Sequence, residues 1–103
     1  MAETLGILFT TSPESENTHT VIKLAEAAIA RGAAVHIFMM CDGVHNAFDP
    51  GFEALLEKGV QIVLCSHSLG ERRRPKIEGA ILCGSQYDHA QLVHKVDRYL
   101  AFN

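Results

Sequence analysis

The sequence predicts an α/β fold in which a parallel sheet lies between helices on both of its faces. Short apolar runs of strand length alternate with segments of helical periodicity, and the connections between them are short. Strands joined in this way pair in parallel through right-handed crossovers. No repeat, low-complexity tract or linker interrupts the pattern, so we expect residues 1–103 to form a single domain.

The first half of the chain contains two predicted strands and two predicted helices. An apolar run at residues 5–9 ends in a polar loop at residues 10–17. From Thr18 onward, apolar residues recur at helical spacing and predict a helix. Gly32 ends it as a C-terminal cap. Residues 35–40 form the second strand. A glycine turn leaves that strand, and Asp49 with Pro50 starts a short helix that reaches about residue 58.

The second half repeats the alternation. Residues 60–64 form a buried strand that ends on Cys65, and a capping box of Ser68 and Glu71 predicts a helix from about Leu69. Pro75 stops that helix, and residues 80–83 form a fourth strand.

A second capping signal predicts the last helix. Ser85 with Asp88 starts this helix near Gln86, and its periodicity predicts that three residues are buried: Ala90, Val93 and Val96. The pattern of residues 98–102 fits either more helix or a closing edge strand.

Composition and charge exclude several function classes. With 48% apolar and 20% charged residues, the chain has the composition of a folded globular domain. Its formal net charge of −3 argues against a nucleic-acid-binding protein. No apolar stretch has the length of a membrane-spanning helix, and no signal-peptide pattern opens the chain. An odd number of cysteines suits a reducing compartment, so we expect a cytoplasmic protein.

Cys65 is the residue best suited to chemistry. In open parallel sheets, ligands and reactive groups collect beyond the carboxyl ends of the strands, where Cys65 lies. We expect its sulfur at an open rim, reachable from solvent or from a neighbouring subunit. The helix start, His67 and the run of Arg72, Arg73 and Arg74 would lower the pKa of the thiol. An inert, half-buried cysteine is the alternative.

The predicted topology places six side chains with reactive or metal-ligating groups at one edge of the sheet: Cys41, Cys65, Cys83, His45, His67 and His89. The first interpretation is thiol chemistry on Cys65, with Cys41 and Cys83 as second thiols. The second is a metal or small-ligand site, because zinc prefers cysteine and histidine, although the chain lacks a C-x-x-C pair. The third is purely structural: the cysteines pack strand ends in an assembly subunit without chemistry.

The basic run after Cys65 also has two interpretations. Arg72 and Arg73, together with His67 and Ser68, would bind a sulfur oxyanion, a carboxylate or an acidic partner protein, since arginine forks suit these groups. A solvated helix face is the alternative.

Several segments together resemble the DsrE/DsrF-like family, which includes DsrE, DsrF, DsrH and the TusD- and TusC-like proteins of sulfur relay. The resemblance lies in the opening strand with its polar loop and alanine-rich helix, and in residues 38–44 (FMMCDGV). It continues in residues 56–60 (LEKGV), which lead to Cys65, and in the closing residues 96–102 (VDRYLAF).

The resemblance implies a three-layer α/β/α sandwich, flavodoxin-like in appearance, whose five-stranded parallel sheet ends with a strand from Asp97. It also implies trimers or hexamers, homomeric or built from related subunits, that pass persulfide sulfur between thiols without a metal or organic cofactor. The sulfur-carrying cysteine of the family matches Cys65. Some members have a second cysteine three residues later, where this chain has Ser68.

The leading hypothesis is therefore a small sulfurtransferase-like sulfur carrier. It holds a persulfide or thiosulfonate on Cys65 and exchanges sulfur with donor and acceptor proteins. The alternatives are the metal- or ligand-binding module and the assembly subunit without chemistry. We expect neither a nucleic acid nor a membrane as partner.

Overall fold

The five strands form a single parallel sheet. The structure is a computed structural model that describes residues 3–73 and 81–103. In spatial order the strands are β4 (Ile81–Gly84), β3 (Gln61–Cys65), β2 (Ala34–Met39), β1 (Thr4–Phe9) and β5 (Arg98–Phe102), and neighbours run parallel. The predicted parallel sheet is confirmed. The closing segment is a strand, as the family resemblance implies.

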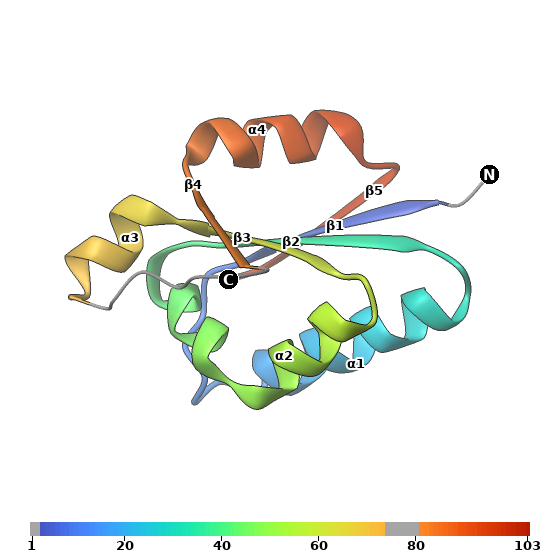
Figure 1. The fold of residues 1–103 in the computed structure, drawn as a ribbon, viewed down its shortest axis with the longest axis horizontal. Helices are drawn as coiled ribbons and strands as arrows, with labels where there is room; N and C mark the ends of the chain where they lie inside the picture. The colour runs from blue at the N-terminus through green and yellow to red at the C-terminus, as the bar shows by residue number, and fades with distance from the viewer. Residues whose placement is uncertain (1–2, 74–80) are drawn as a thin grey trace.

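Helices lie on both faces of the sheet (Figure 1). α1 (Asn17–Ala30) and α2 (Pro50–Glu57) cover one face, and α4 (Gln86–Lys95) covers the other. The short α3 (Ser66–Glu71) continues beyond the end of β3. A 3-10 helix, η1 (Cys41–Phe48), connects β2 to α2, where the sequence predicts only a glycine turn. Within residues 3–73 and 81–103, no helix is long and apolar enough to cross a membrane.

Local signals account for most helix boundaries. The Asp49 carboxylate accepts the backbone N–H of Gly51 at 2.8 Å and caps α2 as predicted. Ser85 and Asp88 form the predicted capping box at the start of α4. Gly32 follows α1 with a φ of 85°, a conformation that side chains with a Cβ rarely adopt.

The main core lies between the sheet and the layer of α1 and α2. Ile7 and Phe9 of β1 and Ile37 of β2 are fully buried there, together with Phe52 of α2. The rings of Phe9 and Phe52 have centroids 5.9 Å apart in a tilted arrangement. Burial of each such side chain contributes roughly 1.5–3 kcal/mol to folding. Most of the buried apolar side chains therefore lie on this face of the sheet.

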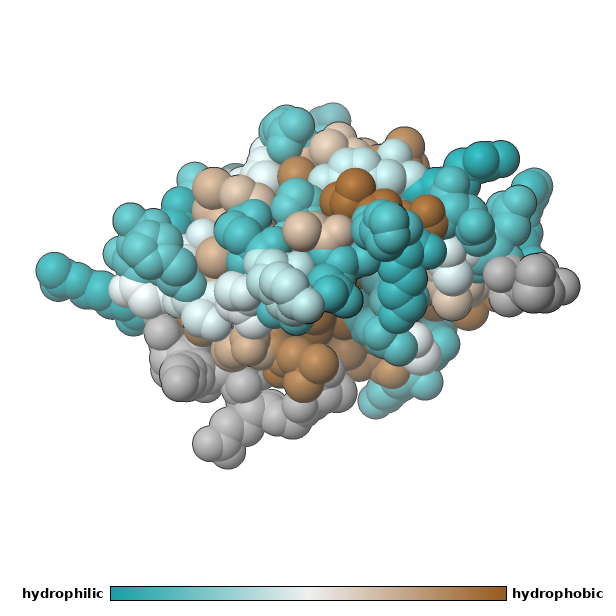
Figure 2. All heavy atoms as spheres, turned by 90° about the horizontal axis from the view of Figure 1, so that it is seen from above, coloured by the Kyte–Doolittle hydropathy of each residue, from teal (hydrophilic) through white to brown (hydrophobic). Residues whose placement is uncertain are grey.

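The opposite layer is thinner because α4 alone covers it. Its buried cluster consists of Phe38, Cys65 and Leu92. α4 comes close to the sheet at Gly6, where an added Cβ would lie 2.7 Å from the Leu92 side chain. Figure 2 shows apolar residues exposed among polar ones on this face. Leu82 of the edge strand β4 is 62% exposed.

The face that α4 turns to the sheet differs from the predicted face. Ala90 is exposed and Val93 is 44% exposed, so their predicted burial is wrong, whereas Val96 packs against the buried cluster. His89 and Leu92 face the sheet instead. Both sets of residues recur at helical spacing, and the set that packs on the sheet is the one that includes the His89 ring.

The start of α3 also differs from the prediction. The helix begins at Ser66 with Cys65 as its N-cap residue, so Ser68 is not the cap. Ser68 lies inside the first turn and is buried, which leaves its hydroxyl to make other contacts. The predicted helix stop at Pro75 lies outside the described residues.

Candidate functional site

The carboxyl edge of the sheet carries all three cysteines. Cys41 follows β2, Cys65 ends β3 and Cys83 lies in β4. Leu64 pairs with Cys83 and Cys65 pairs with Gly84, so neighbouring side chains on these strands alternate between the faces. Cys83 packs toward α1 and α2, and Cys65 belongs to the cluster under α4. The structure therefore brings these two thiols to one edge but to opposite faces of the sheet.

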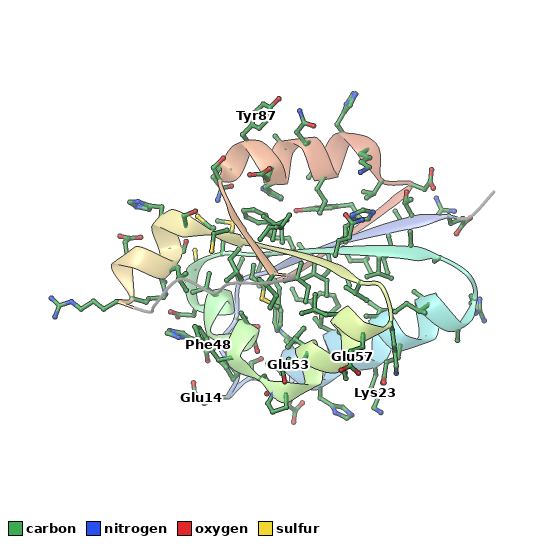
Figure 3. All side chains as sticks on the ribbon, viewed as in Figure 1. Glu14, Lys23, Phe48, Glu53, Glu57 and Tyr87 are labelled. Carbon is green, nitrogen blue, oxygen red and sulfur yellow. The ribbon has the colours of Figure 1, made fainter. Side chains whose placement is uncertain are left out.

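The Cys65 side chain is covered and does not lie open at the rim. Cys65 is only 3% exposed, which contradicts the expectation of an open sulfur. The amide nitrogen of Gln86 lies 3.8 Å from the Cys65 sulfur and 3.6 Å from the Met40 sulfur. Gln86 itself is exposed, and Met40 is half-buried. The Cys65 sulfur thus lies just beneath side chains that reach solvent, and Figure 3 shows sulfur atoms (yellow) near the start of α3.

The environment of Cys65 favours its thiolate. Burial is the largest influence and raises the pKa of the thiol. Hydrogen bonds from the Ser68 hydroxyl, the Ser68 backbone, the Gln86 amide and the His67 backbone lower the pKa, and together they outweigh burial. The pKa of Cys65 is therefore lower than that of an ordinary thiol. The causes are neutral donors, among them backbone N–H groups at the predicted helix start, and the predicted arginines are not among them.

Ser68 connects two of the cysteines. Its hydroxyl oxygen accepts the backbone N–H of Cys41 at 3.0 Å, while its hydroxyl group donates to Cys65. Cys41 is exposed and has a φ of 53°, a left-handed conformation that is uncommon without glycine. One buried serine therefore separates the Cys65 sulfur from the backbone of a second, exposed cysteine.

The predicted anion-binding residues divide into two groups. Ser68 contacts the sulfur, but Arg72 donates to the carboxylate of Asp42 at 2.9 Å and to the Ser68 carbonyl oxygen at 3.2 Å. The charge of Arg72 is thus already paired. The side chain of His67 is 83% exposed and lies 3.4 Å from a Glu71 carboxylate oxygen.

The described part of the basic run after Arg72 does not complete an anion site. Arg73 is exposed and has a φ of 53°. Arg74 and Lys76 lie outside the described residues. The described residues therefore present no cluster of unpaired arginines around Cys65.

Gln86 and Tyr99, which the sequence did not single out, complete the site together with His89, which it did. Gln86 is the first residue of α4, and its side-chain oxygen lies 3.3 Å from the Nδ1 atom of His89. The Nε2 atom of His89 lies 2.8 Å from the hydroxyl of Tyr99 on β5. The capping box at Ser85 locates the helix start, but only the pairing of β3 with β4 places that start beside Cys65.

A metal site finds no support in the geometry. In the part of the chain that the structure describes, no three histidine, cysteine, aspartate or glutamate side chains lie close enough together to hold a metal ion. His67 lies against Glu71, and His89 lies against Gln86 and Tyr99.

The fold and site define a class of small, all-parallel α/β proteins with a hydrogen-bonded cysteine at a strand tip under a single helix. The chain belongs to the DsrE/DsrF-like family, whose model matches residues 3–102. This confirms the predicted family.

Solved structures with the same fold include the ychN protein from E. coli, with a TM-score of 0.87 and 20% sequence identity. That match covers 99% of this chain and 100% of the ychN chain. A conserved protein of unknown function from Bacteroides thetaiotaomicron has a TM-score of 0.82 and 17% identity, over 97% of this chain and 95% of its own. At these identities the likeness concerns the fold, and it confirms the predicted α/β architecture. No curated protein matches the sequence.

Proposed function

We propose that this protein is a sulfur carrier that holds sulfane sulfur on Cys65 as a persulfide and passes it to the thiol of an acceptor protein. The observation that carries the proposal is the lowered pKa of a thiol that is almost fully buried. The thiolate is the nucleophile in sulfur exchange, so donors that favour the thiolate favour the reaction. Membership of a sulfur-relay family supports the same function.

The exchange needs no cofactor and no external oxidant. The Cys65 thiolate attacks the terminal sulfur of a donor persulfide, a new sulfur–sulfur bond forms, and the donor leaves as its thiolate. The proton of the donor persulfide stays on the transferred sulfur. In the second step an acceptor thiolate attacks that sulfur, and Cys65 leaves as a thiolate. The same hydrogen bonds that lower the pKa of Cys65 stabilise it as this leaving group.

The coverage of Cys65 sets a condition on its partners. Because exposed Gln86 and half-buried Met40 cover the sulfur, a donor must displace these side chains before its sulfur reaches Cys65. Displacement of exposed side chains is a small rearrangement that leaves the sheet intact. We therefore expect transfer between proteins that dock at this edge of the sheet.

Mass spectrometry of the intact protein tests the proposal. After incubation with polysulfide or a protein persulfide, the wild-type chain should gain sulfur, and a Cys65→Ser variant should not. A separate incubation with tetrathionate, whose inner sulfur the Cys65 thiolate attacks with release of thiosulfate, would show whether Cys65 also accepts a thiosulfonate group. Cys83→Ser is the matched control, because Cys83 lies on the other face of the sheet and its loss should leave loading intact. Equal loading of wild type and Cys65→Ser would exclude the proposal.

Cys41 is the second thiol that the geometry favours. Its backbone contacts Ser68, which contacts Cys65, and its side chain is exposed. We therefore propose Cys41 as the thiol that meets an incoming partner before or after Cys65. A Cys41→Ser variant should load sulfur on Cys65 but transfer it to an acceptor thiol more slowly. Unchanged transfer would assign the whole reaction to Cys65.

We also infer that the protein forms homo-oligomers, trimers or hexamers as the family resemblance implies. Both edge strands and α4 expose large apolar side chains: Leu82 at 62%, Leu100 at 43% and Val93 at 44%. Such residues favour contact with another subunit. Sedimentation measurements over a range of concentrations should show a species larger than a monomer, and a monomer throughout would contradict the inference.

A further inference from the structure

A continuous chain of hydrogen-bonding side chains runs from β5 across α4 to the sulfur on β3. It starts at the Tyr99 hydroxyl, passes through the His89 ring, continues through the Gln86 amide and ends at Cys65. Gln86 is not required as the cap of α4, since Ser85 and Asp88 form the capping box there. Its side chain is therefore available to contact Cys65 and His89.

The direction of each hydrogen bond follows from the chemistry of the partners. The Gln86 nitrogen faces two sulfur atoms, which leaves its oxygen, a pure acceptor, toward His89. The Nδ1 atom of His89 must therefore carry a proton. In the neutral ring the Nε2 atom is then an acceptor, and it receives the proton of the Tyr99 hydroxyl at 2.8 Å. Every donor in the chain points toward Cys65.

The protonation states needed for this direction are those that the site favours. Burial lowers the pKa of His89, so the ring is neutral at neutral pH. Burial raises the pKa of Tyr99, so the phenol keeps the proton that it donates. The His89 ring also stacks on Phe38, with centroids 5.1 Å apart and planes at 19°, which limits its rotation.

We propose that Gln86 is a catalytic hydrogen-bond donor to the reactive sulfur, and that His89 and Tyr99 are positioning residues that keep its N–H edge turned toward Cys65. The inference rests on the proposed function, in which Cys65 is the sulfur that reacts. An unrestrained glutamine at an exposed helix start would present its oxygen to the sulfur as readily as its nitrogen, and an oxygen would repel a thiolate. The bond to Nδ1–H of His89 removes that orientation.

The test is the pH dependence of alkylation of Cys65 by iodoacetamide, followed on its peptide by mass spectrometry. The midpoint of this pH dependence reports the pKa of the Cys65 thiol. Gln86→Met keeps the shape of the side chain but removes the donor, so the midpoint should rise by about half to one pH unit. Gln86→Glu replaces the donor with a negative charge and should raise the midpoint further. A midpoint in Gln86→Met equal to that of wild type would overturn the proposal. If the substitution also uncovers Cys65, the maximal alkylation rate at high pH changes. The pH midpoint is a separate quantity, because it depends on the pKa of the thiol.

The positioning residues have their own variants. Tyr99→Phe and His89→Phe should each raise the midpoint in the same direction as Gln86→Met. Tyr87→Phe is the matched control, because the Tyr87 hydroxyl accepts from Gln91 and the side chain points away from the sheet (Figure 3), so its midpoint should equal that of wild type. If the midpoints of Tyr99→Phe and His89→Phe both equal that of wild type, these residues do not position Gln86. Nitrogen NMR shifts of His89 should identify the Nδ1–H tautomer, and the Nε2–H tautomer would overturn the assigned direction.

These measurements separate the further inference from the proposed function. The charged groups near Cys65 are unchanged in the Met and Phe variants: the pair of Arg72 with Asp42, the pair of His67 with Glu71, and Asp88 in the cap of α4. Shifted midpoints without sulfur loading would support the donor chain and exclude the sulfur carrier. Sulfur loading with unshifted midpoints would exclude the donor chain and leave the carrier.

Discussion

Replacement of Ser68 by alanine should change both the chemistry of Cys65 and the stability of the fold. The Ser68 hydroxyl donates to the Cys65 sulfur and accepts the Cys41 backbone N–H at 3.0 Å. Other donors to the sulfur remain, so loss of the hydroxyl should raise the pKa of Cys65 by about half to one unit. The Cys41 N–H is only part-buried, and water can replace its partner, so the stability loss should be about 1 kcal/mol.

Two measurements on the same variant check these magnitudes. The alkylation midpoint of Cys65 reports its pKa, and urea denaturation reports the free energy of unfolding. Ser66→Ala is the matched control: Ser66 lies in the same helix, and its hydroxyl donates to the Gly84 carbonyl oxygen at 2.7 Å. That variant should lose a similar amount of stability with no shift of the midpoint.

The reasoning fails if the Ser68→Ala protein is folded and its Cys65 midpoint equals that of wild type. Such a result would mean that the remaining donors alone set the pKa. A midpoint shift of the same size in Ser66→Ala would also refute it, because the effect would then come from movement of α3 rather than from loss of the hydroxyl.

Three further predictions follow from other residues. Because the folded-state pKa of Cys65 is lowered, its thiolate stabilises the protein above the unfolded-state pKa, and this stabilisation disappears as pH falls through the folded-state pKa. The difference in unfolding free energy between wild type and Cys65→Ser should therefore grow from neutral to alkaline pH; a constant difference would contradict this. Asn46→Ala removes a fully buried amide that makes three hydrogen bonds and should cost about 3 kcal/mol in urea denaturation; a loss below about 1 kcal/mol would be inconsistent with those bonds. Gly43→Ala should cost at least roughly 3 kcal/mol, since the new Cβ meets the backbone oxygen of Phe9, whereas Gly70→Ala has open space and should be neutral or slightly stabilising; equal thermal stability of the two variants would be the contrary result.

Local sequence signals predicted the elements because their causes are local. Alternation of apolar runs with helical periodicity identified the strands and the helices, and the Asp49 and Ser85 caps identified two helix starts. Each of these signals lies within one strand or helix and the residues next to it, so no distant contact is needed to interpret them. The Ser68–Glu71 pattern failed because the Ser68 hydroxyl has other partners: it donates to nearby Cys65 and accepts the backbone N–H of Cys41, which is 27 residues away and which no local pattern reveals.

The position of Cys65 at a strand tip could likewise be predicted from the sequence, whereas the groups that surround its sulfur could not. Cys65 ends an apolar run, so its place at a strand tip follows from the order of residues. Its burial does not follow, because the cover comes from Gln86 and Met40, which are 21 and 25 residues away in sequence. The nearby arginines suggested a charged environment, but Arg72 pairs with Asp42 once the chain folds.

The sequence by itself determined that this is an alternating α/β chain with a cysteine at the carboxyl end of a buried strand, since strand and helix propensity and capping act between near neighbours. The tertiary structure alone decided which face each thiol occupies and which polar groups reach the sulfur. The physical reason is that strand order and helix docking bring β3, the start of α4 and β5 together. The hydrogen bond from Gln86 to Cys65 and the one between Tyr99 and His89 depend on this docking, whereas Ser68 reaches Cys65 within the first turn of α3.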